Sequence, residues 1–173
     1  MASTGDNHDD GASPSELLIE AARRNNTDLL SEVLLKNSTA EFLNNTCDAL
    51  GNTALHVAAQ YGSYDILDVL LDQEGLEVDP VNKIEGDTPL HKAVFLAREH
   101  QELGLEVAEL LLDAGADPRV RNKQKMKPLD VTDPRDTKLR KALVNGEYTM
   151  TAGNDLVDEN DLEDDAGSEG ESE

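Results

Sequence analysis

Apolar residues recur every three or four positions in several segments of the chain, the spacing that places them on one face of an α-helix. Two of these segments, DILDVLLD at 65–72 and EVAELLLD at 106–113, share the same pattern. Each follows a shorter apolar run that begins at a threonine. The pattern predicts pairs of helices joined by turns.

The shorter runs contain a repeated motif. The frame Gly-x-Thr-x-Leu-His occurs in GNTALHVAAQYG at 51–62 and in GDTPLHKAV at 86–94, 35 residues later. A period of about 33 to 41 residues built from helix, turn, helix and an extended connection predicts a solenoid of stacked units. The flanking segments at 15–26 and 125–136 keep only part of the frame. Terminal caps of a solenoid behave in this way because one of their faces meets water.

Composition agrees with a helical domain of ordinary size. The 173 residues include only five aromatic side chains and no Trp, so the core must be built mainly from Leu, Val, Ile and Ala. Cys47 is the single cysteine, which excludes an intrachain disulfide framework and any multi-cysteine metal cluster. No segment approaches the roughly 20 apolar residues of a membrane span, and the first residues do not form a secretory signal. We expect a protein of the cytoplasm or the nucleus, away from membranes.

The net charge of −22 is unevenly distributed along the chain. Residues 1–14 hold three acids and residues 147–173 hold 11, and neither segment has Lys or Arg, so residues 15–146 carry a charge of −8. Within them, residues 119–141 hold nine bases against three acids. A run of like charge with little apolar content does not bury enough surface to fold. We therefore expect a disordered N-terminus at 1–14, a folded domain at 15–146 and a disordered acidic tail at 147–173.

The motifs TALHVAAQYG, TPLHKAV, VLLD…EVDP and ELLLDAGADP, in this register, resemble the ankyrin-repeat family over residues 15–144. The resemblance implies an all-α solenoid of four helix-turn-helix units, two regular and two degenerate caps. The layout is similar to that of small fungal ankyrin-repeat proteins with acidic tails. These include a yeast chaperone of a small-subunit ribosomal protein.

Six residues of the frame are expected to be structural. Thr53 and Thr88 stand at N-cap positions, Pro89 in a first helical turn, and Gly62 at a helix end that favours left-handed backbone. The resemblance implies that the two histidines bond within the turn and to neighbouring backbone. The full set is Thr53, His56, Gly62, Thr88, Pro89 and His91.

The third unit is longer than the second. Ala58 to Asp65 spans seven steps, whereas the equivalent Ala93 to Glu106 spans thirteen, an insertion of six residues within FLAREHQELGLE. We expect the first helix of this unit to run on until Gly104 breaks it. Such an insertion either contacts a partner or is a tolerated surface loop.

The resemblance also implies that the concave face, formed by the connecting fingers and the exposed side of the first helices, binds another protein. The positions carried over are Arg23, Arg24, Leu50, Asn52, Gln60, Tyr61, Ile84, Glu85, Asp87, Phe95, Leu96, Lys123, Gln124 and Met126. Five of them are expected to form an exposed apolar stripe: Leu50, Tyr61, Ile84, Phe95 and Met126. The alternative is that Phe95 and Leu96 are buried beneath the insertion.

Motifs for catalysis are absent from the sequence. It has no glycine-rich phosphate loop, no HExxH or Cys/His cluster and no nucleophile elbow, so we expect neither an enzyme nor a cofactor, metal or small-molecule substrate. The basic strip at 119–141 has no aromatic residues interleaved, which disfavours nucleic-acid binding. We expect a monomer whose partner is another protein.

Two functional hypotheses remain. In the first, the chain is an escort whose concave face grips a basic client such as a ribosomal protein while the acidic tail screens the client's charge. In the second, it is an adaptor whose tail is a regulated linear motif, with Ser168 beside Glu169 and Glu171 as a candidate phosphorylation site. The reversal of charge sign between 119–141 and 147–173 adds the hypothesis that the tail folds back on the last unit.

Overall fold

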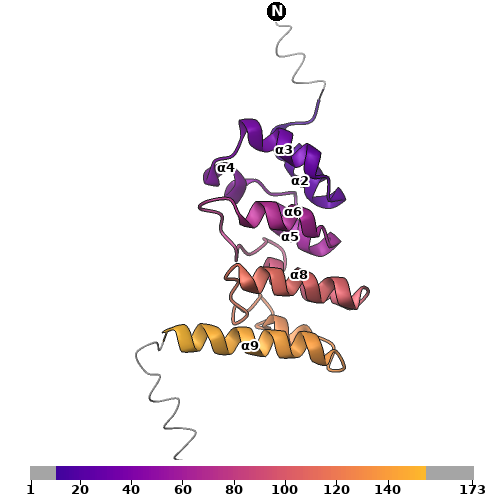
Figure 1. Ribbon diagram of the computed structural model, residues 1–173, viewed down its shortest axis with the longest axis vertical. Helices are drawn as coiled ribbons and strands as arrows, with labels where there is room; N and C mark the ends of the chain where they lie inside the picture. The colour runs from indigo at the N-terminus through magenta and orange to yellow at the C-terminus, as the bar shows by residue number, and fades with distance from the viewer. Residues whose placement is uncertain (1–10, 155–173) are drawn as a thin grey trace, which may run out of the picture.

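The computed structural model describes residues 11–154, and within them the chain is all α-helical with no β-strand. The elements are α2 (Pro14–Arg24), α3 (Thr27–Lys36), α4 (Ala40–Asn45), α5 (Ala54–Tyr61), α6 (Tyr64–Leu71), α7 (Pro89–Ala97), α8 (Gln101–Asp113), the 3-10 turn η1 (Pro128–Val131) and α9 (Thr137–Asn154). Figure 1 shows helix pairs stacked along the long axis of the molecule. The predicted all-α solenoid is confirmed.

The helices form two layers. In the inner layer α2 packs on α5, α5 on α7 and α7 on η1, and in the outer layer α3 packs on α6, α6 on α8 and α8 on α9. The four predicted units are therefore α2–α3, α5–α6, α7–α8 and η1–α9. The last unit has a single 3-10 turn in place of a first helix. The sequence explains this difference. Pro134 disfavours helical backbone at Asp133, so the segment that begins at Pro128 is too short to form a full α-helix before the chain turns into α9.

The core between the layers consists of the residues that the frame predicts. Leu18, Leu55 and Leu90, at equivalent positions of the first three units, are all buried. Alanines of the inner helices beside them are completely buried, which allows neighbouring helices to approach closely. These alanines are Ala21, Ala22, Ala58, Ala59 and Ala93.

The turns between paired helices use left-handed backbone. Gly62 ends α5 with φ of 69°, as predicted. Asn25 occupies the equivalent position after α2 with φ of 54°. Its side-chain oxygen accepts a hydrogen bond from the backbone N–H of Ile66 at 3.1 Å, so Asn25 also ties the first unit to the start of α6. Asparagine adopts left-handed backbone more readily than most residues, and here its side chain makes this second contact as well.

The insertion in the third unit lengthens the second helix of the pair, not the first. The prediction that Gly104 breaks the first helix is wrong, because α7 ends at Ala97 and Gly104 lies buried inside the 13-residue α8. A Cβ atom on Gly104 would lie 2.4 Å from Cα of Ala97. The glycine therefore lets the added turn of α8 cross close over α7.

The boundary predicted at residue 146 falls inside α9, which continues to Asn154. Glu147, the first residue assigned to the tail, forms an ion pair with Lys127 at 2.8 Å. Thr149 and Thr151 donate hydrogen bonds from their hydroxyls to backbone carbonyls one turn earlier. The helix is thus anchored to the last unit beyond the predicted boundary. Residues 1–10 and 155–173, including Ser168, lie outside the described residues.

Candidate protein-binding face

Three loops connect successive units, and we call them finger 1 (residues 47–53), finger 2 (residues 81–88) and finger 3 (residues 121–127). Each is closed by a backbone hydrogen bond across the loop, from the N–H of Asp48 to the carbonyl of Asn52 (2.9 Å), Asn82 to Asp87 (3.0 Å) and Asn122 to Met126 (3.0 Å). The fingers are therefore small hairpins of defined geometry, one after each of the first three units.

One side chain organises each finger from within. Asp48, Asn82 and Asn122 stand at equivalent places near the start of their fingers, and each uses one side-chain oxygen to accept two backbone N–H groups of its own loop. The donors are Leu50 (2.9 Å) and Asn52 (2.9 Å) to Asp48, Glu85 (3.2 Å) and Asp87 (3.0 Å) to Asn82, and Gln124 (2.9 Å) and Met126 (3.1 Å) to Asn122. Such bonds satisfy loop amides that would otherwise need water.

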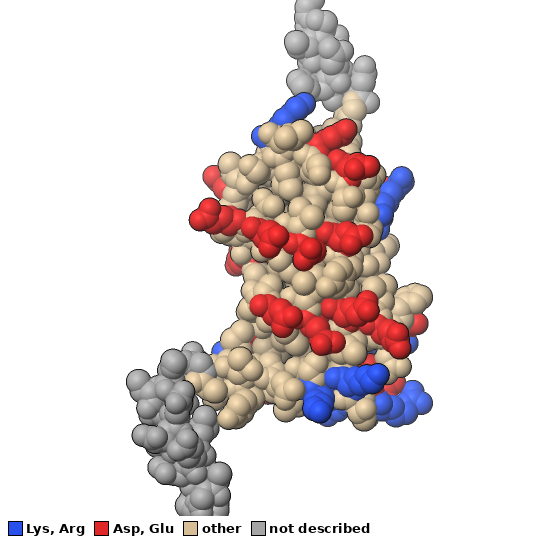
Figure 2. All heavy atoms as spheres, in the orientation of Figure 1, with Lys and Arg blue, Asp and Glu red and all other residues tan. Residues whose placement is uncertain are grey.

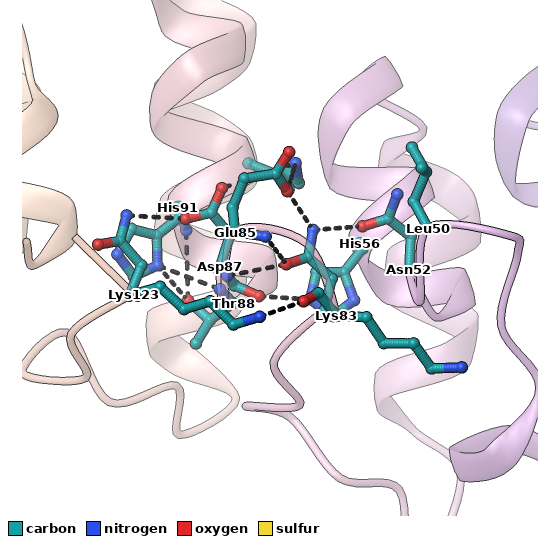
Figure 3. A network of polar contacts seen from close by, with 12 residues as sticks. Leu50, Asn52, His56, Lys83, Glu85, Asp87, Thr88, His91 and Lys123 are labelled. Atoms are coloured by element: carbon teal, nitrogen blue, oxygen red, sulfur yellow. Dashed lines mark hydrogen bonds and ion pairs between the residues drawn. The ribbon is translucent and has the colours of Figure 1, made fainter. Parts of the chain in front are cut away.

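The same residues join one finger to the next (Figure 3). The side-chain amide of Asn82 donates to Oδ1 of Asn52 at 2.8 Å, and that of Asn122 donates to Oδ1 of Asp87 at 2.9 Å. Asn52 and Asp87 are consequently buried, with 4% and 2% of their surface exposed. The prediction that these two residues contact a partner is wrong, because both side chains accept hydrogen bonds that join neighbouring fingers.

Glycines allow this close stacking. Gly51 has φ of 85°, and a Cβ atom there would lie 2.6 Å from the backbone nitrogen of Lys83. Gly86 has φ of 73°, and its Cβ would lie 3.0 Å from the backbone nitrogen of Lys123. Each finger thus rests directly on the glycine of the previous one, with hydrogen bonds from the N–H of Lys83 to Leu50 (3.1 Å) and of Lys123 to Glu85 (2.9 Å).

The two frame histidines continue the link into the helices. Nδ1 of His56 accepts the N–H of Thr53 at 3.0 Å, so the ring proton is on Nε2, which donates to the carbonyl of Asp87 at 2.7 Å. His91 does the same between Thr88 (3.1 Å) and Met126 (2.9 Å). Burial lowers the pKa of His56 to about 4 and also lowers that of His91. Both rings are neutral structural groups, as predicted.

The remaining structural predictions also hold. Thr53 and Thr88 occupy the N-cap positions of α5 and α7 in extended backbone, and the hydroxyl of Thr88 accepts the N–H of His91 at 3.3 Å. Pro89 is in the first turn of α7, where its missing N–H has no partner to lose.

Exposure sorts the predicted contact residues into three groups. Leu96 is buried at 9% exposure beside Leu103 of the lengthened α8, so it does not reach a partner. Phe95 and Met126 are half-buried. The rest are exposed, namely Arg23, Arg24, Leu50, Gln60, Tyr61, Ile84, Glu85, Lys123 and Gln124.

The predicted apolar stripe is not continuous. Leu50 and Ile84, with 51% and 56% exposure, lie on the fingers, whereas Tyr61 lies at the far end of α5 beside the guanidinium of Arg23, 5.9 Å from its ring. An eight-residue helix separates these ends by about 12 Å. We call the exposed side chains of the fingers the finger edge, which consists of Leu50, Val81, Lys83, Ile84, Lys123, Gln124 and Lys125.

Charge is segregated between the outer helices and finger 3. The outer helices α6 and α8 contain no Lys or Arg, and exposed carboxylates run along and just beyond them: Asp65, Asp68, Asp72, Glu102, Glu106, Glu109 and Asp113. Figure 2 shows carboxylates in two rows across this face, with the largest group of Lys and Arg in this view near α9. Residues 119–127 carry five bases and no acid. The surface thus offers an acidic face and a basic finger.

Two aspartates at equivalent unit ends have opposite electrostatic environments. Both carboxylate oxygens of Asp79 accept the N–H of Asp117, at 3.2 and 3.0 Å, yet burial raises the pKa of Asp79 to about 6. The guanidinium of Arg119, 2.9 Å from Asp117, lowers the pKa of Asp117. Ionisation of Asp79 therefore lowers the stability of the fold, whereas ionisation of Asp117 raises it.

Sequence reasoning missed the organising residues Asp48, Asn82 and Asn122. The available signal was an Asx residue five or six positions before the frame threonine or its equivalent, in DALGNT, NKIEGDT and NKQKMK. Among residues 11–154 no cluster of His, Cys, Asp or Glu is suited to hold a metal ion. Within the same residues no helix has the length and apolarity that crossing a membrane requires.

Comparison with known proteins agrees with this architecture. A family model for ankyrin repeats in three copies matches residues 18–122. An ankyrin repeat-containing protein of Saccharomyces cerevisiae is 49% identical over 128 residues, covering 70% of this chain and 71% of that protein. The Caenorhabditis elegans homologue of transient receptor potential cation channel subfamily A member 1 is 42% identical over 77 residues, 44% of this chain and 6% of its own. Alpha-latrocrustotoxin-Lt1a of Latrodectus tredecimguttatus is 35% identical over 81 residues, 47% and 5% respectively. The stacked helix pairs, the fingers and these matches together show that the chain belongs to the ankyrin-repeat family.

Proposed function

We propose that this ankyrin-repeat interaction module is an escort that binds a basic client protein and has no catalytic activity of its own. The observation that carries the proposal is the finger edge, where the fold leaves Leu50, Val81 and Ile84 more than half exposed on loops that are otherwise rigidly bonded. Exposed apolar side chains on a preorganised surface are typical of a protein-binding site, because binding then orders few groups.

The apolar part of the client contacts the finger edge in this proposal. Leu50 and Ile84 are on adjacent fingers, joined by the hydrogen bond from Lys83 to the carbonyl of Leu50. Full burial of an exposed Leu or Ile side chain is worth about 1.5–3 kcal/mol, and these two are about half exposed, so each can add about 1 kcal/mol to a complex. The two residues are therefore the expected anchors, and Gln124 and Lys123 of finger 3 lie on the polar rim next to them.

The charge of the chain favours a basic client over an acidic one. The net charge is −22, and the carboxylates of α6 and α8 face solvent without any base on those helices. Attraction at long range speeds the encounter with a positively charged protein and keeps the pair soluble. A ribosomal protein is one example of such a client.

Affinity capture from a cell extract tests this proposal. The baits are the full chain, the Leu50→Glu/Ile84→Glu variant and, as a matched control, Leu35→Glu, which changes a residue 84% exposed on α3. We expect the full chain and the control to capture one dominant basic protein, and the double variant to lose it. Capture that is equal on all three baits would contradict the finger edge as the binding site.

An adaptor role is the second candidate, and the basic finger 3 favours it. Lys123 and Lys125 form no ion pair with a carboxylate of residues 11–154, and their charge suits an acidic partner segment more than a basic client. In that case the dominant captured protein would be acidic or neutral, and charge reversal at Lys123 and Lys125 would release it while the apolar variant would hold it.

A further inference from the structure

Finger 3 carries positive charge that the described residues do not balance. Five bases lie within residues 119–127, and two of them form close ion pairs. Arg119 pairs with Asp117 at 2.9 Å, and Lys127 pairs with Glu147 at 2.8 Å. Arg121 is 3.8 Å from Asp130. No carboxylate within residues 11–154 forms an ion pair with Lys123 or Lys125, which are both exposed. The ammonium of Lys123 donates to the backbone carbonyl of Lys83, a neutral group that leaves its charge unbalanced (Figure 3). These two lysines at the end of the solenoid are therefore a suitable site for an acidic segment.

Helix α9 brings the chain directly to this finger. Gly146 lies against Leu112 and Pro118, next to Arg119, and Glu147 pairs with Lys127 at the base of finger 3. From Glu147 the helix continues seven residues to Asn154, about 10 Å at 1.5 Å per residue. The last described residue of the helix, Asn154, therefore lies only about 10 Å along the axis from the Glu147–Lys127 ion pair.

The segment at 155–173 has the composition that this surface requires. It carries ten acids and no base in 19 residues, and three large apolar residues are interspersed with the acids: Leu156, Val157 and Leu162. An extended chain of this length reaches at most about 68 Å, several times the axial length of α9 beyond Glu147. The acidic faces of α6 and α8 would repel it, and finger 3 with the neighbouring Ile84 offers both opposite charge and apolar surface.

We propose that residues 155–173 dock in cis on finger 3, with carboxylates against Lys123 and Lys125 and Leu156, Val157 or Leu162 beside Ile84. Docking covers Ile84, Lys123 and Lys125 of the finger edge, so the tail competes with a partner for that surface. A basic client attracts the same acidic segment and frees the finger edge as it binds. This inference uses the surface of the proposed function but needs no knowledge of the partner.

Backbone amide NMR shifts of the isolated full chain test the docking without any client. Spectra are compared at low salt and at about 1 M salt, where the screening length is about 3 Å. We expect amides of finger 3 and of Leu156, Val157 and Leu162 to shift together when salt is removed. Tenfold dilution should leave these shifts unchanged, because the contact is within one chain.

Two variants with the same change of charge separate docking on finger 3 from general attraction. Lys123→Glu/Lys125→Glu should abolish the salt-dependent shifts of the tail, whereas Lys138→Glu/Lys141→Glu, on exposed positions of α9, should preserve them. Circular dichroism checks that both variants remain folded. Equal tail shifts in the two variants, no salt-dependent shift in the full chain, or shifts that vanish on dilution would each overturn the proposal. None of these results bears on whether a client is captured.

Discussion

Asp79 provides a quantitative test of the electrostatics at the unit ends. Burial raises the pKa of its carboxyl to about 6, whereas the pKa of an aspartate in an unfolded chain is about 3.9. A folded-state pKa above the unfolded value means that the native state holds its proton more tightly. The ionised Asp79 therefore destabilises the fold, and this cost appears as the pH rises from about 4 through about 6.

The Asp79→Asn variant removes that cost and keeps the structural contact, because the amide oxygen still accepts the N–H of Asp117. A shift of about two units corresponds to about 3 kcal/mol at full burial. Asp79 is partly exposed, so solvent screening reduces the gain. We expect a stabilisation of about 1–2 kcal/mol at pH 7.5 and almost none at pH 4.

Urea unfolding followed by circular dichroism at the two pH values measures this difference. Asp117→Asn is the matched control, since Arg119 lowers the pKa of Asp117 and neutralising it should destabilise the protein at pH 7.5. An Asp79→Asn variant that is less stable than the parent at pH 7.5, or equally more stable at both pH values, would refute the burial argument.

Three other predictions concern the fingers and the frame. Burial lowers the pKa of His56 from about 6.5 to about 4, so the contribution of His56 to stability is complete above pH 6.5 and is lost as pH falls towards 4. Nitrogen-detected NMR at pH 6 should show a neutral ring protonated at Nε2. A charged ring at that pH would contradict the assignment. Lys125 has φ of 68° at the position where finger 1 has Gly51, so Lys125→Gly should raise the free energy of unfolding by about 1 kcal/mol, with no gain expected if that backbone is unstrained. Gly51→Ala should destabilise the protein more than Gly115→Ala: both glycines have positive φ, but a Cβ at Gly115 meets nothing within 4 Å, and equal melting temperatures would argue against finger stacking on Gly51.

The helices and their caps were predictable from the sequence because their signals are local. Thr53, Thr88 and Gly62 act within one turn of the backbone, and the alanines of the inner helices follow a period that sequence alone displays. The frame histidines were recognised through family resemblance, and their partners, the carbonyls of Asp87 and Met126, lie in the next unit.

The errors arose where the neighbouring unit decides the outcome. Asn52 and Asp87 are on loops that look exposed in sequence, but the next finger buries them through Asn82 and Asn122. Gly104 costs a helix about 1 kcal/mol in isolation, yet close packing of α8 on Ala97 favours it. Glu147 belongs to an acidic run by composition and to α9 by its ion pair with Lys127. Each of these contacts joins residues from different elements of the fold, so the sequence pattern within one repeat does not reveal it.

The finger edge is the surface that we propose binds the client. Hydrogen–deuterium exchange of the full chain, alone and in complex with the captured protein, shows whether the client contacts it. We expect binding to slow exchange of backbone amides in residues 48–52, 82–87 and 121–126, with little change on the outer helices. Protection confined to α6 and α8 would contradict it and would place the client on the acidic outer face.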